Sequence, residues 1–226
     1  MWARENGCPW GKQTFHAVAL GGKLQTAKYM KENGCNWSAR TTEHAARKNQ
    51  VEMLQWLVQN GCPWSEGVCQ AAAEEGHLET LKWVIDNGHS WSETKSCNAA
   101  IHGGKLHVLK WLVEEKKAAL RSSHCNIAVK LDTMEILQWI QSKGNYCDER
   151  TCVVAAQNGK LDTLKWLRSI DCPWNQYVVI DSIYNKHFDI AKWAIENGCP
   201  WTKEEAIEAA QDMQNEDIEN WLKSQK

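Results

Sequence analysis

The sequence predicts an all-α protein, an α-solenoid of stacked antiparallel helix pairs with little or no β-structure. The first observation is a tryptophan-rich repeat, since the chain has 14 Trp and only two Phe among its 226 residues. The second is that a short apolar helix, a glycine and another short helix recur along the chain. The third is that no segment alternates between polar and apolar residues over the length of a strand.

Two columns of residues with a period of 27 or 28 contain every tryptophan. The first column is the triplet Cys8-Pro9-Trp10 and its relatives Cys35-Asn36-Trp37, Cys62-Pro63-Trp64, His89-Ser90-Trp91, Cys172-Pro173-Trp174 and Cys199-Pro200-Trp201. The second column is Trp2, Tyr29, Trp56, Trp83, Trp111, Trp139, Trp166, Trp193 and Trp221. A further column holds Cys69, Cys97, Cys125 and Cys152. A fixed period of this kind indicates a repeat architecture.

The segment 65–91 illustrates one repeat. Ser65 offers an N-cap for a first helix over 67–75, and Gly76 is expected to end that helix. The second helix is expected over 77–86, with an apolar stripe at Leu78, Leu81, Val84 and Ile85. Each helix is too short to be stable alone in water. Stacked pairs can bury the stripes against one another, as in a solenoid.

The whole chain, 1–226, is expected to form a single repeat domain. It begins with the tail of a second helix at 2–7 and continues with eight helix pairs. We expect an irregularity near 114–122, because 115–119 replaces the usual Gly-Cys-Pro-Trp turn. The acidic segment 203–226 is interpreted as a C-terminal cap with a polar outer face, and as a partner site in the alternative.

Composition and charge exclude several classes of protein. A net charge of −2 gives no reason to expect nucleic acid as a partner. No apolar run is long enough to span a membrane, and 1–7 lacks the apolar stretch of a signal peptide. Ten cysteines without a secretion signal indicate an intracellular protein, cytoplasmic or nuclear, with reduced thiols.

The repeat resembles the ankyrin repeat over essentially the whole chain. The stretch Ala71-Ala72-Ala73-Glu74-Glu75-Gly76-His77-Leu78-Glu79 is similar to the family's Ala-Ala-x-x-Gly-His-Leu-Glu core, and 155–161 repeats it. The segment Asn60-Gly61-Cys62-Pro63-Trp64 stands where the family has Asn-Gly-Ala-Asp-Val. The chain is most similar to the short Cys-Pro-Trp variety found in algae, oomycetes and large DNA viruses. The family's unit has 33 residues, so the shorter unit implies blunt loops in place of β-turn fingers.

The tryptophans and cysteines are interpreted as structural. In the resemblance Trp83 replaces a buried leucine and Trp64 a buried valine, so we expect buried indoles rather than a stacking platform for bases or peptides. Trp2 and Trp10 are the expected exceptions, partly exposed. No Cys-x2-Cys pair occurs, and packed helices lie about 8–10 Å apart, so neighbouring cysteines of one column cannot share a metal ion or form a disulfide.

No signature of catalysis is present. The sequence has no nucleophile elbow, no glycine-rich phosphate loop and no His-Glu-x-x-His helix. We therefore expect that the protein is not an enzyme and that it uses no metal, no cofactor and no small-molecule substrate.

Variable positions at the end of each first helix are the candidate binding residues, since the resemblance places them on the concave face. The predicted partner-binding residues are Arg47, Lys48, Glu74, Glu75, His102, Lys130, Gln157, Asn158, Tyr184 and Asn185. Val153 and Ile180, together with Tyr184, are expected to form an apolar patch if their column is exposed.

The sequence thus predicts a non-catalytic scaffold that binds a protein or peptide on its concave face. The alternative is the substrate-recognition arm of a ubiquitin-ligase or other effector complex. Nucleic-acid binding is a third hypothesis, which the net charge disfavours.

Overall fold

A computed structural model describes residues 10–144 and 146–225, and these form sixteen helices. No strand occurs in this part of the chain, as the sequence predicts. The fold divides into two compact units, Met1–Ala119 and Leu120–Lys226. The division falls beside the segment 115–119, where the sequence departs from the repeat. The predicted helix tail at 2–7, Trp2 and Cys8 lie outside the described residues.

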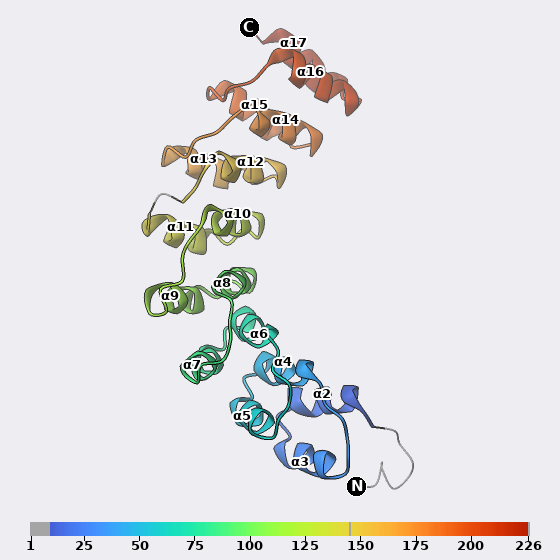
Figure 1. The fold of residues 1–226 in the computed structure, drawn as a ribbon. Coiled ribbons are helices and arrows are strands. Elements are labelled where there is room, and N and C mark those ends of the chain that lie inside the picture. Colours follow the sequence, from blue (N-terminus) through green and yellow to red (C-terminus); the bar gives the residue numbers. More distant parts are fainter. Residues whose placement is uncertain (1–9, 145, 226) are drawn as a thin grey trace. The chain divides into compact units, whose positions relative to one another are not determined.

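Each unit contains four helix pairs (Figure 1). The pairs of unit 1 are α2 (Lys12–Leu20) with α3 (Leu24–Glu32), α4 (Ala39–Arg47) with α5 (Val51–Gln59), α6 (Gly67–Glu75) with α7 (Leu78–Asp86), and α8 (Glu93–His102) with α9 (Leu106–Glu114). The pairs of unit 2 are α10 (Ser122–Lys130) with α11 (Met134–Ser142), α12 (Glu149–Gln157) with α13 (Leu161–Ser169), α14 (Tyr177–Tyr184) with α15 (Phe188–Glu196), and α16 (Lys203–Asp212) with α17 (Glu216–Ser224). The helices expected over 67–75 and 77–86 are confirmed to within one residue.

The first helices of successive pairs pack directly on one another within each unit. In unit 1 this row is α2, α4, α6 and α8, and in unit 2 it is α10, α12, α14 and α16. In each unit the second helices lie along one side of this row (Figure 1). Small residues make the close approach possible, because Ala45, Ala46, Ala72 and Ala73 are all fully buried where α4 and α6 meet their neighbours.

A residue with a left-handed backbone follows the first helix of every described pair. These residues are Gly22, Asn49, Gly76, Gly104, Asp132, Gly159, Lys186 and Gln214. Gly76, with φ 88°, ends α6 as the sequence predicts. At the irregular segment Lys117 has φ 62°, close to the 76° of Gly61 at the equivalent turn. The left-handed residue is therefore kept where the sequence has lost its glycine, although the turn is one residue longer: the Ala118 N–H bonds the Leu112 carbonyl oxygen, six residues back, and the Cys62 N–H bonds that of Leu57, five residues back.

The third residue of several first helices accepts a hydrogen bond from the backbone of the residue before the helix. Thr41 Oγ1 accepts from the Ser38 N–H at 3.2 Å, and Thr151 Oγ1 accepts from the Asp148 N–H at 3.2 Å. In α10 the same position holds His124, whose Nδ1 accepts from the Arg121 N–H at 3.1 Å. This contact requires Nδ1 to be unprotonated. His124 is fully buried, and its Nε2 has no hydrogen-bond partner among the described residues.

The core consists mainly of aliphatic and cysteine side chains, and the prediction that the tryptophans are buried is confirmed only in part. No described indole, Trp64 and Trp83 included, is completely buried, and none is fully exposed. The Trp64 Nε1 atom is itself buried, and Trp10, which was expected to be partly exposed, is half-buried like the others. The smaller Leu81 and Val84 fill the space between helices.

The half-buried indoles contact one another and the cations beside them. The Trp37 and Trp56 ring centroids lie 5.8 Å apart, edge to face, and so do those of Trp174 and Trp193. The Arg168 guanidinium lies 4.4 Å from the Trp174 ring centroid. These contacts are favourable without full burial.

Candidate interaction surface at the ends of the first helices

The structure places all ten predicted partner-binding residues in the last turn of a first helix or directly after it. We call this surface the first-helix ends. Unit 1 contributes Arg47, Lys48, Glu74, Glu75 and His102, and unit 2 contributes Lys130, Gln157, Asn158, Tyr184 and Asn185. None of the ten is buried. Because the first helices stack within each unit, the members of each set follow one another along the ends of one row of helices.

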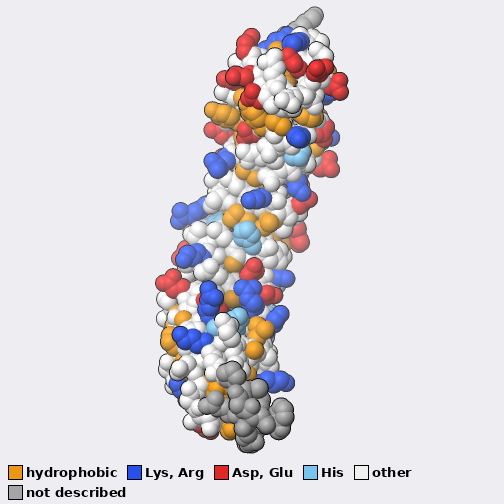
Figure 2. Space-filling view, turned by 90° about the vertical axis from the view of Figure 1, so that its right-hand side faces the viewer, with side chains coloured by type: hydrophobic (Ala, Val, Ile, Leu, Met, Phe, Trp, Pro, Cys, Tyr) orange, Lys and Arg blue, Asp and Glu red, His pale blue; other side chains and the backbone are white. Residues whose placement is uncertain are grey.

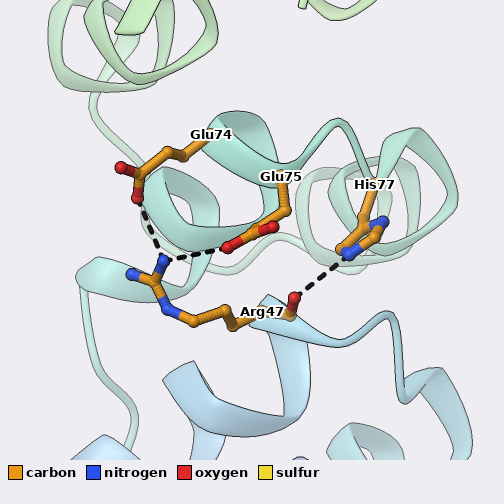
Figure 3. Close-up of polar contacts among 4 residues, drawn as sticks. All are labelled: Arg47, Glu74, Glu75 and His77. Atoms are coloured by element: carbon orange, nitrogen blue, oxygen red, sulfur yellow. Dashed lines mark hydrogen bonds and ion pairs between the residues drawn. The ribbon is translucent and has the colours of Figure 1, made fainter. Parts of the chain in front are cut away.

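In unit 1 three charged residues of this set, Arg47, Glu74 and Glu75, are paired with one another (Figure 3). The Arg47 guanidinium lies 3.2 Å from Glu74 Oε2 and 3.1 Å from Glu75 Oε1. His77 Nε2 donates a hydrogen bond of 3.1 Å to the Arg47 carbonyl oxygen. Both ion pairs are partly exposed, so each contributes only about 0–1 kcal/mol to stability. Their main consequence is that the Arg47 charge is already compensated by carboxylates, whereas the three groups together keep a net negative charge.

A shallow depression of about 280 Å³ lies between α6 and α8 of unit 1. Glu74 and His102 line it, together with Gln70, Lys95 and Asn98. Lys95 Nζ is 3.9 Å from Glu66 Oε2. The charged groups of this depression therefore also have partners of opposite sign.

In unit 2 the equivalent positions carry different chemistry. Glu74 follows Arg47 by 27 residues, and Gln157 follows Lys130 by the same 27 (157 − 130). Amides thus stand at 157 and 158, where unit 1 has two carboxylates. Gln157 Nε2 donates to Asp181 Oδ2 at 2.7 Å, across α12 and α14. Lys130 has no ion-pair partner among the described residues.

Two adjoining depressions lie over α10, α12 and α14 of unit 2. The larger, of about 640 Å³, is lined by Lys130, Arg150, Asn126, Gln157, Asn158 and Asn185 among others. The smaller, of about 440 Å³, is lined by Glu149, Val153, Tyr177 and Asp181 among others. Arg150, Val154 and Gln157 border both.

Arg150 and Val154 were missed by the sequence analysis, although one pattern could have identified them. They precede Gln157 by seven and three residues, so the three side chains share one face of α12. Extending the predicted column back along the helix would have included them.

The expected apolar patch is present in part. Tyr184 is 43% exposed, whereas Val153 and Ile180 are half-buried. Tyr177, which the sequence analysis did not select, is 53% exposed and lies one turn before Ile180 on α14. Figure 2 shows hydrophobic side chains gathered in a band in its upper part, near the C-terminal end. The Tyr184 hydroxyl donates to Asp212 Oδ2 at 3.1 Å.

All nine described cysteines are buried and free. The linker thiols donate to a backbone carbonyl of the preceding repeat: Cys62 to Ser38, Cys172 to Asp148 and Cys199 to Asn175, at 3.5, 3.3 and 3.3 Å. Burial raises the pKa of the Cys69, Cys97 and Cys199 thiols to about 12, which suppresses their reactivity.

The distance argument from the sequence covered neighbours in one column and missed contacts between columns. The Cys147 thiol, in a linker, lies beside those of Cys125 and Cys172, and the Cys152 thiol lies 4.0 Å from the Cys172 carbonyl oxygen. These contacts help to raise the pKa of Cys125 and Cys172. Among the described residues no group of three or more His, Cys, Asp or Glu could hold a metal ion. Nor does this part of the chain contain a helix long and apolar enough to cross a membrane.

Comparison with known proteins identifies one part of the chain. A family model described as ankyrin repeats (many copies) matches residues 69–113, from α6 into α9. Ankyrin repeats generally mediate protein–protein interaction, and proteins built from them are typically non-catalytic scaffolds. A search of curated proteins gives no match.

Proposed function

We propose that the chain is a non-catalytic scaffold that binds a protein or peptide partner at the first-helix ends. The observation that carries this proposal is the placement of ten variable side chains, none of them buried, along stacked rigid helices. In unit 2 the same surface is hollowed. Rigid helices allow a partner to be recognised with little ordering of the scaffold.

We assign the remaining repeats to the ankyrin family as well, in its short Cys-Pro-Trp form. The support is that the helix pairs outside 69–113 have nearly the same helix lengths, 8–10 residues, and the same left-handed turns as those inside it. We also propose an intracellular location, because the nine described thiols are free and a reducing compartment keeps them so.

The test is affinity capture with the intact chain as bait, followed by quantitative mass spectrometry. The test variant carries alanine at Arg47, Lys48, Tyr184 and Asn185. Specific partners should be recovered at least about tenfold less well, as expected when several interface side chains are truncated together.

The control variant carries alanine at four exposed positions of second helices, Glu135, Gln138, Asp162 and Lys165. It should recover the same partners as the unmodified chain. Equal recovery by both variants would show that the binding surface lies elsewhere.

A further inference from the structure

The larger depression of unit 2 has a cationic lining without a carboxylate. Lys130 reaches it from the end of α10 and Arg150 from the first turn of α12. Both side chains are exposed, and neither has an ion-pair partner among the described residues. This differs from Arg47 in unit 1, whose two acidic neighbours already occupy its guanidinium.

We propose that this depression binds the carboxylate of an acidic side chain in a peptide segment of the partner. An apolar residue next to that acid lies in the adjoining depression. The inference rests on the proposed function and specifies the chemistry of the partner. In structural terms, the partner's acid takes the place that Glu74 and Glu75 occupy in unit 1.

The lining offers enough donors for a carboxylate. Lysine and arginine present three and five N–H groups, respectively. The Asn158 and Asn185 amides each use one N–H to bond the carbonyl oxygens of Val154 and Asp181, both at 2.8 Å, and retain a second. Charge-assisted hydrogen bonds of this kind are about twice as strong as neutral ones.

The lining of the adjoining depression determines which residue can stand next to the acid in the bound peptide. The apolar groups there are Val153, Val154 and the largely exposed Tyr177 ring, which suit an aliphatic or aromatic side chain. Glu149 and Asp181 also line it. Their carboxylates repel an extended polyanion that continues beyond the larger depression. The charge pattern therefore favours a peptide with an isolated acid over a nucleic acid.

The experiment begins with selection from a library of random displayed peptides against the intact chain. Selected peptides should contain an acidic residue beside an apolar one. Replacing that Glu or Asp by its amide should weaken binding about tenfold, measured by fluorescence polarisation. Binding should also weaken as salt is added, because the site is open to solvent.

Variants of the chain then locate the site. Lys130→Gln and Arg150→Gln should each weaken the binding of the selected peptide about tenfold. Gln157→Glu places a carboxylate beside Lys130, as Glu74 stands beside Arg47 in unit 1, and should weaken binding of the peptide as well. Lys165→Gln, which removes an exposed cation from the second helix α13, is the matched control, and it should leave the affinity within about twofold. Circular dichroism melting curves should show that all four variants remain folded.

The outcomes separate the two proposals. If peptides are selected but tolerate loss of their acid, or if the Lys130, Arg150 and Gln157 variants bind them as well as the unmodified chain, the inference is overturned and the scaffold proposal stands. If no peptide is enriched over background, both are overturned. Stronger competition by a single-stranded oligonucleotide than by the free acidic peptide would assign the depression to nucleic acid and overturn the inference.

Discussion

At the ends of their first helices, the two units use equivalent positions in different ways. In unit 1 the cation Arg47 is shared between Glu74 and Glu75 of the next repeat. In unit 2 the corresponding cation is Lys130, and the next repeat presents amides at Gln157 and Asn158. The backbone is the same in both, since each segment is the end of one first helix facing the next. The comparison shows how a repeat fold can either pair a cation with carboxylates of the next repeat or leave it available for a partner. The difference is whether acids or amides stand at two positions.

The largest expected effect tests whether the two units are separate at all. Leu54 in unit 1 and Leu164 in unit 2 occupy the same position of their second helices, and both are fully buried. Replacing either by alanine should cost about 2–5 kcal/mol of unfolding free energy. Amide hydrogen exchange should show faster exchange mainly in the unit that carries the substitution. Equal acceleration in both units would show that the chain unfolds as one cooperative body.

An intermediate effect concerns pH. Burial lowers the pKa of His124, and the Arg121 charge lowers it further. The unfolded chain therefore takes up a proton near the ordinary value of 6.5 while the folded chain does not. The contribution of neutral His124 to the free energy of unfolding is complete above pH 6.5. It falls as the pH drops from 6.5 toward the lowered pKa that His124 has in the folded chain. The slope is at most about 1.4 kcal/mol per pH unit.

His124→Thr sharpens this prediction, because Thr41 and Thr151 make the same backbone contact without titrating in this range. The variant should lose less stability between pH 7.5 and 5.5 than the unmodified chain, measured by urea unfolding. Some dependence should remain, since burial and His44 also lower the pKa of His16 in unit 1. An unchanged pH profile would show that His124 is not the responsible group.

The smallest effect is expected from removing the two ion pairs of Arg47 in unit 1. Replacing Glu74 and Glu75 together by glutamine should change the unfolding free energy by no more than about 1 kcal/mol, because both pairs are partly exposed. It should also leave Arg47 available, as Lys130 is in unit 2. We expect this variant to gain weak, salt-sensitive binding of the acidic peptides selected on unit 2. No gain would show that a free cation is insufficient without the amide-lined depression.

Much of the fold could be predicted from the sequence because its determinants are local and repeated. A glycine or asparagine after many of the helices and an alanine pair inside several first helices are visible in the order of the residues, and the helices at 67–75 and 77–86 follow from them. The incomplete burial of Trp64 and Trp83 could not be predicted in the same way. Substitution for a smaller core residue suggests burial, but only the actual space between helices decides whether an indole fits.

The candidate site was predictable in position and less so in chemistry. The period of 27 residues is enough by itself to align Arg47 with Glu74, and Lys130 with Gln157. Whether a cation is neutralised depends on the side-chain conformations that bring its nitrogen within reach of a carboxylate. Arg150 was missed because it lies near the start of α12, two turns before the variable column.

The bond from the linker thiols of Cys62, Cys172 and Cys199 to a carbonyl 24 residues earlier has a consequence for how such a chain can grow. Donor and acceptor always belong to adjacent repeats, so a tandem gene duplication copies both partners at once. An inserted copy would meet its neighbours with the complementary groups already in place, and no distant contact would need to be rebuilt. Array length is therefore free to vary during evolution while the junctions stay the same.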